Sequence, residues 1–257
     1  MGKSDPIGKK FYAPLASAER LSDACFWTAA VFSIVALQID KVSKPIAYDA
    51  VQTIFALSVM ALFVIGLAAR LYWSMRAQSK RVSDFISQSF DVPLIVEKSE
   101  GFFNNSQTEP FRRMAASVLE NTLFSKSILQ RMLRNERGKV AAYSCLWFVA
   151  LLNRATDLAL ITGIAQVILS EQIISKWIRM EWLRARVEGI YDDVYSLIQS
   201  TGNNAGSKEF RAHVLECLLR YETAKAQAGI SLSTGLFRKL NPSLSAEWQT
   251  IAARLNI

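Results

Sequence analysis

The sequence predicts an all-α membrane protein with four transmembrane helices in two hairpins, helical stalks and a mainly α-helical cytosolic region. Three observations predict this fold class. Hydrophobic residues make up 51% of the 257 residues, which is more than a soluble domain with 20% charged residues normally carries. These residues are gathered in a few long runs separated by strongly charged stretches. Within the charged stretches, apolar residues recur at the spacing of an amphipathic helix.

The first hairpin is predicted from two apolar runs, 24–39 and 50–69, which contain no Asp, Glu, Lys or Arg. The second run has about 20 residues, the length that a helix needs to cross the hydrocarbon core of a bilayer. The intervening stretch DKVSKPIAYD contains Pro45 and two aspartates, which is typical of an exposed turn. Basic residues are more numerous outside this pair of runs than between them. The positive-inside rule therefore predicts that both ends of the hairpin face the cytosol.

The second hairpin is predicted from the apolar run 140–170, whose only charged residues are Arg154 and Asp157. Basic clusters lie on both sides of this run, so an even number of crossings is expected. Asn153 tolerates the left-handed geometry that ends a helix, Thr156 can cap the next helix, and Asp157 would lie in its first turn. We therefore predict a turn at these four residues, although each arm would have only about 13 uncharged residues. The alternative is a single span or a re-entrant segment, with each charge at mid-depth costing about 2.5 to 3.5 kcal/mol.

The cytosolic region is expected to begin as a helical extension of the second span. Apolar residues recur at helical spacing from Leu71 to Phe90, and Asp91 and Pro93 then end the helix. The stretch VPLIVEKSEGFFNNSQTEP has no helical period and contains turn formers, so a structured loop is predicted. Two amphipathic helices are expected to follow it, and their approximate bounds are 110–120 and 125–137.

The fourth span is also expected to continue into the cytosol as a stalk, until the loop STGNNAGS ends it. After that loop the sequence predicts a helix to about Ala228, the loop GISLSTGLF, and a last helix that begins near Ser243 with Ser243 or Ser245 as its cap. The predicted segments are a cytosolic N-terminal segment (1–23), transmembrane hairpin 1 (24–73), a cytosolic stalk, loop and amphipathic helices (74–138), transmembrane hairpin 2 (139–176), and a cytosolic stalk with C-terminal helices (177–257).

Signatures of catalysis are not found in the sequence. It contains no glycine-rich phosphate loop, no GxSxG elbow, no HExxH motif and no cysteine cluster. The single histidine, His213, is expected at a helix surface, and the adjacent acids Asp192 and Asp193 are expected on a solvated face. We therefore expect a protein that is not an enzyme and that uses no cofactor or metal.

One loop has residues suited to a nucleotide. KSEGFFNNS offers two aromatic rings for base stacking, two carboxamides for base edges and a lysine for a phosphate. The simpler interpretation is a loop whose phenylalanines fill a helix junction. Basic residues just after the loop are a second candidate, although the positive-inside rule alone also accounts for them. The candidate ligand-binding residues are Lys98, Phe102, Phe103, Asn104, Asn105, Arg112 and Arg113.

The order of the spans and several strings resemble the SMODS-associated four-transmembrane family of pore-forming effectors. The strings are SQSFDVPLIVEKSEGFFNNS, ENTLFSKSILQRMLRNERGK, LLNRATDLALITGIAQVILSEQIISKWIRMEWLR and LLRYETAKAQAGISLSTGLFRKLNPSLSAEW, and the resemblance covers residues 24–248. Members of that family accompany bacterial nucleotidyltransferases that make cyclic nucleotide signals during phage infection. The resemblance implies a multi-pass protein of the bacterial inner membrane with both termini in the cytoplasm.

The resemblance also implies the partners. They are the lipid bilayer, further copies of the chain in a homo-oligomer, and a cyclic di- or trinucleotide made by a partner nucleotidyltransferase; no nucleic acid polymer is expected. Sensing this ligand would lead the chain to oligomerise or open and to permeabilise the membrane. Two other functions stay open from the residues alone, namely a small channel or transporter and a membrane-anchored scaffold that recruits a cytosolic partner. Polar residues in the predicted spans are few, which disfavours a transport path.

Overall fold

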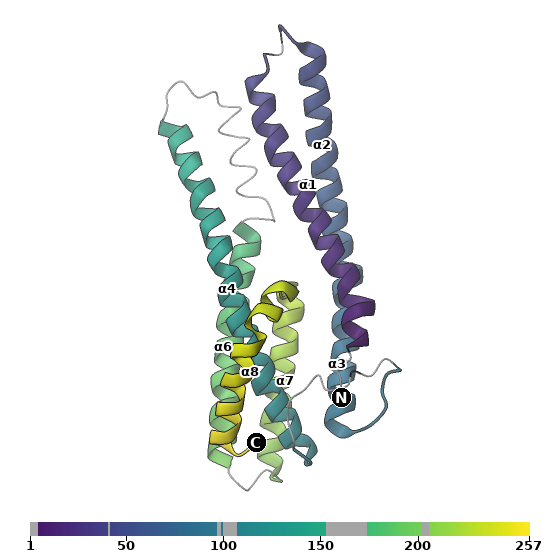
Figure 1. Cartoon of the computed structure of the whole chain (residues 1–257), viewed down its shortest axis with the longest axis vertical. Coiled ribbons are helices and arrows are strands. Elements are labelled where there is room, and N and C mark those ends of the chain that lie inside the picture. Colours follow the sequence, from purple (N-terminus) through teal and green to yellow (C-terminus); the bar gives the residue numbers. More distant parts are fainter. Residues whose placement is uncertain (1–4, 41, 97–98, 100–106, 153–173, 202–205) are drawn as a thin grey trace. The chain divides into compact units, whose positions relative to one another are not determined.

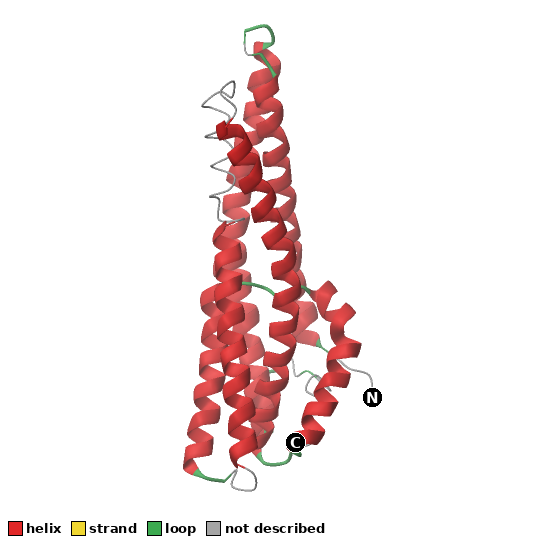
Figure 2. Ribbon diagram, turned by 90° about the vertical axis from the view of Figure 1, so that its left-hand side faces the viewer, coloured by secondary structure: helices red, strands yellow, loops and turns green. Residues whose placement is uncertain are grey.

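The computed structural model describes residues 5–40, 42–96, 99, 107–152, 174–201 and 206–257, and these residues form helices and connecting loops only (Figures 1 and 2). The prediction of an all-α fold is confirmed for this part of the chain. The helices are α1 (Ala13–Gln38), α2 (Pro45–Ala68), α3 (Met75–Phe90), α4 (Pro110–Leu152), α6 (Lys176–Thr201), α7 (Lys208–Ala228) and α8 (Thr234–Leu255), with π-helical turns η1 (Gly8–Tyr12) and η2 (Ala69–Ser74).

The chain divides into two compact units. Residues 11–75 and 136–177 form one unit, called the hairpin unit below. Residues 1–10, 76–135 and 178–257 form the other, called the bundle unit. Each unit is described separately.

In the hairpin unit, α1 and α2 pack against each other along their length (Figure 1). The turn between them is closed by Asp40, whose carboxylate accepts from the Val42 amide at 3.0 Å and whose carbonyl accepts from the Lys44 amide at 3.0 Å. Pro45 follows at the first position of α2, where its fixed φ angle favours a helix and its missing N–H group costs nothing. The predicted turn between the first two apolar runs is therefore confirmed.

The helix that contains α2 begins in the hairpin unit. It runs without a break from Pro45 through η2 to Phe90, as the sequence predicted for the second span and its stalk. Its most apolar 18-residue window has a mean hydropathy of 2.3, and only 6% of that window is buried. Among the described residues this is the one helix long and apolar enough to cross a membrane. The other three predicted spans stay predictions, and the predicted turn at Asn153, Arg154, Thr156 and Asp157 lies outside the described residues.

Ion pairs connect the two ends of residues 136–177, the second chain segment of the hairpin unit. The Glu136 side chain on α4 is nearly buried and lies 3.1 Å from Lys139 Nζ and 3.5 Å from Lys176 Nζ. Residues 136 and 176 are therefore neighbours in space, although a long apolar stretch separates them in the sequence.

In the bundle unit, α6, α7 and α8 each contact the first part of α4. Its core consists of side chains that recur every three or four residues along each helix, because that spacing places them on one face. The fully buried members of this core include Met114, Val118, Leu119, Leu123, Ile128, Leu129, Leu133, Met180, Leu183, Val187, Ile190 and Val194. A hydrogen bond of 2.7 Å between Ser125 Oγ and Tyr221 OH ties α4 to α7 within this core.

Two predicted helix boundaries were wrong. The helices expected at 110–120 and 125–137 are one helix, α4, because the residues between them include neither Gly nor Pro and Leu123 is fully buried. Thr122 satisfies its hydroxyl inside this helix, where it donates to the carbonyls of Val118 and Leu119 at 2.9 Å. The last helix begins at Thr234 rather than near Ser243, since Ser233 Oγ caps it by accepting from the Leu236 amide at 3.3 Å.

Candidate ligand-binding site

A buried carboxylate on α3 organises the start of the loop between α3 and α4. Asp84 has no exposed surface, and its carboxylate accepts from the amide of Ser99 at 3.2 Å and from the Ser99 hydroxyl. Arg81 lies beside it, with Nη1 at 3.9 Å from Asp84 Oδ2, and its other terminal nitrogen pairs with Asp5 at 2.8 Å. The buried negative charge is thus compensated by two donors and one guanidinium, as a buried charge requires.

The same stretch of α3 also holds the end of this loop. Gln88 Nε2 donates to the carbonyl and hydroxyl oxygens of Ser99 at 3.0 and 3.1 Å. Arg113, in the first turn of α4, donates from Nη1 to the Gln88 carbonyl at 2.9 Å and from Nε to the Gln107 carbonyl at 2.7 Å. Residues on both sides of the segment 100–106 are therefore fastened to one region of α3, between Asp84 and Gln88.

These contacts place only part of the predicted ligand-binding set. Arg112 and Arg113 are half-buried at the start of α4, where Glu109 caps the helix by accepting from the Arg112 amide at 2.5 Å. Arg113 contacts main-chain carbonyls, so in this structure it positions the loop. Contact of either arginine with a ligand stays a prediction. The other five predicted residues, Lys98, Phe102, Phe103, Asn104 and Asn105, lie outside the described residues.

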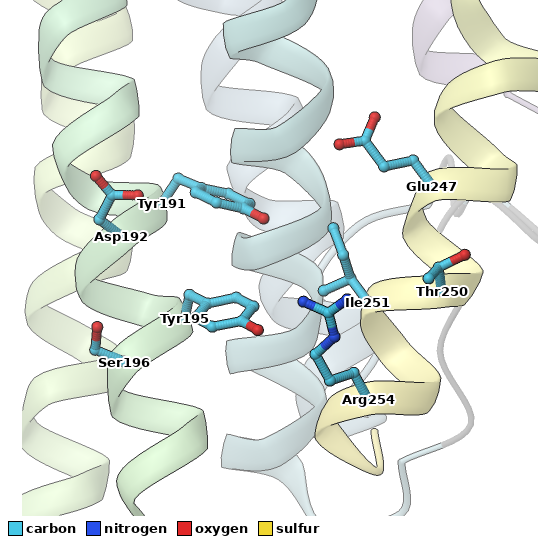
Figure 3. Close-up of a pocket in the computed structure, with 8 residues that line it drawn as sticks. All are labelled: Tyr191, Asp192, Tyr195, Ser196, Glu247, Thr250, Ile251 and Arg254. Carbon is cyan, nitrogen blue, oxygen red and sulfur yellow. The ribbon is translucent and has the colours of Figure 1, made fainter.

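A second site, which the sequence interpretation missed, is an open groove of about 650 Å³ between α6 and α8 (Figure 3). Tyr191 and Tyr195 project from α6 toward α8, with ring centroids 6.2 Å apart and ring planes inclined by 30°. The groove is lined by Tyr191, Asp192, Tyr195, Ser196, Glu247, Thr250, Ile251 and Arg254. Asp192 and Asp193 are exposed, as the sequence predicted, but the two tyrosines that flank them lie four residues apart on one helix and form an aromatic pair.

Charged groups surround Tyr191 on several sides. Lys126 of α4 places its Nζ 3.2 Å from the centroid of the Tyr191 ring. Burial lowers the pKa of the Lys126 ammonium group, and the carboxylates of Glu247, Asp192 and Glu188 partly oppose that shift. Burial likewise raises the pKa of the Tyr191 phenol, with a further contribution from Glu247. Near pH 7 the Tyr191 phenol is therefore neutral, and Lys126 Nζ lies over the electron-rich face of its ring.

The groove has the chemistry to bind a flat polar molecule. The tyrosine rings provide faces for stacking, the Arg254 guanidinium can pair with an anionic group, and the Glu247 carboxylate can accept from an amine. The described residues contain no group of three or more His, Cys, Asp or Glu side chains that could hold a metal ion.

Comparisons with known proteins give no further assignment. The chain matches no protein-family model, no curated protein and no solved structure at a significant level. The family resemblance of the sequence therefore stays an expectation, and the two sites are interpreted by their own chemistry.

Proposed function

We propose that the chain is a membrane effector of a bacterial antiphage system, which senses a cyclic oligonucleotide in its cytosolic region and then oligomerises or opens to permeabilise the inner membrane. The observation that carries the membrane part of this proposal is α2, whose most apolar window is only 6% buried. A helix in the core of a soluble protein would be mostly buried. Apolar surface in water is unfavourable by about 25 cal/mol per Å², so lipid is the favoured surrounding for α2.

The proposed topology has four membrane spans in two hairpins, with both termini in the cytoplasm. The ion pair between Glu136 and Lys176 supports the second hairpin, because a segment whose two ends are neighbours must leave and return. Lys139 and Lys176 also place positive charge at both ends of the stretch between residues 136 and 176. The positive-inside rule requires such charge for cytosolic flanks. A single span would instead separate those two ends by the thickness of the bilayer.

The sensing part of the proposal is supported by the groove between α6 and α8. A nucleotide needs a stacking surface, a partner for its phosphate and acceptors for its base amines, and Tyr195, Arg254 and Glu247 offer these groups on one groove. The nature of the trigger comes from the family resemblance. A sharp response requires that the ligand bind the open or assembled state several kcal/mol more tightly than the resting state.

The test is dye release from liposomes that contain the purified full-length chain, with a panel of cyclic di- and trinucleotides. We expect release with at least one of them and a weakened response in Arg254→Gln. The matched control is Arg238→Gln, which removes an exposed arginine from the same helix outside the groove. Release without any ligand would indicate a constitutive channel. An inserted protein that releases no dye with any ligand would instead support a scaffold.

A further inference from the structure

We propose that one exposed face of α7 is a self-association seam, which takes α7 of a second copy of this chain in parallel orientation. The seam consists of Ala212, Leu215, Leu219, Thr223 and Ala226, called the α7 stripe below. The proposal names the surface through which copies meet. It rests on the proposed function in one respect, because membrane insertion is what brings the copies to a high local concentration.

The α7 stripe lies opposite the side of α7 that faces the bundle core. The core side is buried and contains Phe210, Val214, Cys217, Leu218, Tyr221, Ala224 and Ala228. On the stripe, Leu215 is 41% exposed and Leu219 is 65% exposed, and the three smaller members are exposed as well. The members follow one another at steps of three and four residues, which is the spacing of a coiled-coil seam. Small residues at both ends of the stripe allow two helices to approach closely.

The charges beside the α7 stripe specify the orientation. Ala212, Leu219 and Ala226 take heptad position a, and Leu215 takes position d. Arg211 then occupies position g, while Glu216 and Thr223 occupy position e. In a parallel pair, a g residue lies opposite the e residue that follows it by one heptad on the other helix. Arg211 therefore faces Glu216 of the second copy, and symmetry repeats this ion pair. In an antiparallel pair g positions face each other, which would oppose like charges.

Contacts within the chain are compatible with these roles. Arg211 lies over the Phe111 ring at 5.3 Å, which holds its guanidinium at one border of the α7 stripe. The Glu216 side chain is 57% exposed at the other border, 3.5 Å from His213. Glu222 interrupts the seam at the next d position, where Lys225 binds its carboxylate at 2.9 Å. A polar residue at such a position limits affinity and favours one register.

The size of the α7 stripe sets the conditions for association. Two partly exposed leucines and three small residues supply much less than the roughly 800 Å² per partner of a stable complex in solution. Copies inserted in one membrane have a high effective concentration, so a weak contact becomes sufficient.

Cysteine cross-linking tests the seam and its direction. The full-length chain, with Cys25, Cys145 and Cys217 replaced by alanine, would carry Ala212→Cys, Leu219→Cys or Ala226→Cys in liposomes. In a parallel pair each position meets itself, so we expect all three variants to form disulfide dimers about ten times faster than His213→Cys, an exposed control off the stripe. An antiparallel pair would cross-link at one of these positions at most, and that result would overturn the proposal.

Charge exchange tests the ion pair. In the Leu219→Cys chain, Arg211→Glu and Glu216→Arg are each expected to slow dimer formation about tenfold, because each places like charges opposite each other twice. The double variant should restore the original rate, which a defect in folding would not do. Failure of all stripe variants to cross-link, in protein that floats with the liposomes, would overturn the seam. The dye-release assay would report separately on the proposed function.

Discussion

At the residue scale, burial distinguishes two ion pairs of the bundle unit. Asp84 has no exposed surface and is held by Ser99 and Arg81. Asp193 pairs with Arg220 at 2.7 Å, but the two side chains are 50% and 43% exposed. Removing one partner of a buried pair leaves an uncompensated group in a low-dielectric surrounding, whereas water replaces a lost surface partner.

The buried pair gives the first prediction. Asp84→Ala should lower the free energy of unfolding by about 3 to 5 kcal/mol, because Ser99 loses its buried acceptor and Arg81 loses an opposite charge beside it. Asp193→Ala, the exposed control, should change it by about 1 kcal/mol or less. Urea unfolding of the full chain in detergent, followed by tryptophan fluorescence, measures both values. Equal effects of the two variants would contradict the assigned role of Asp84.

The second residue-scale prediction concerns pH. Burial raises the pKa of the Cys217 thiol above its usual value near 9, and Arg220 opposes only part of that shift. The folded pKa is thus higher than the unfolded one. The thiol's contribution to stability is complete below the unfolded pKa and is lost as pH rises through the folded pKa. Stability should therefore fall as the pH rises above about 8.

Cys217→Ala removes this group and provides the comparison. Its urea midpoint should fall less steeply over the same pH range than that of the original chain. The pKa shifts of Lys126 and Tyr191 are shared by both proteins, so they do not affect the difference in slope. Parallel pH profiles would show that the thiol does not titrate as described.

At the element scale, two methionines on one continuous helix provide a matched pair. Met60 lies within the apolar part of α2, Met75 lies beside Arg76 at the start of α3, and both are 64% exposed. Met60→Arg should cost about 2.5 to 3.5 kcal/mol of membrane insertion, while Met75→Arg adds a charge beside Arg76, in the proposed cytosolic flank. Flotation of the expressed protein with membranes measures the difference. Equal flotation of the two variants would argue against insertion of α2.

The elements that the sequence predicted correctly are those with strong local signals. Pro45 begins α2, and α3 ends at Phe90, immediately before Asp91 and close to Pro93. The signals at α4 and α8 were ambiguous. Thr122 is a cap-forming residue type, but its hydroxyl is satisfied inside α4. Ser243, a predicted cap, lies inside α8 and donates to the Leu240 carbonyl at 2.9 Å. Local propensity does not indicate whether Ser233 or Ser243 caps α8, because that choice depends on which side chains become buried.

The candidate sites were less predictable than the helices because they depend on contacts between distant parts of the chain. The loop after α3 was found from its composition, but the role of Asp84 in holding Ser99 has no local signature. The groove joins Tyr191 on α6 to Glu247 on α8, and no spacing rule connects those positions. Periodicity predicts which side of each helix is buried. It does not predict which helices become neighbours.

At the scale of the whole molecule, the proposed mechanism depends on an even number of membrane crossings on each side of the α3–α4 loop. The contact of Glu136 with Lys176 favours a return of the chain within 137–175, and the Asp40 turn connects the two helices of the first hairpin. With four crossings, the groove and the α7 stripe lie on the cytosolic side, where a signal made in the cell can reach them. With three crossings, α7 and α8 would lie outside the cell.

Accessibility of single cysteines in cells tests this topology directly. In the chain without its native cysteines, Ser43→Cys and Ala155→Cys should react with a membrane-impermeant maleimide added outside the inner membrane, because each lies at a predicted outer turn. Gly206→Cys should stay unlabelled until the membrane is broken, and nothing lies within 4 Å of a Cβ atom added there, so the substitution should be tolerated. Labelling of positions 43 and 206 with no labelling of 155 would indicate a single span between α4 and α6. That pattern would place the groove outside the cell and would overturn both the topology and the sensing mechanism, while leaving the first hairpin intact.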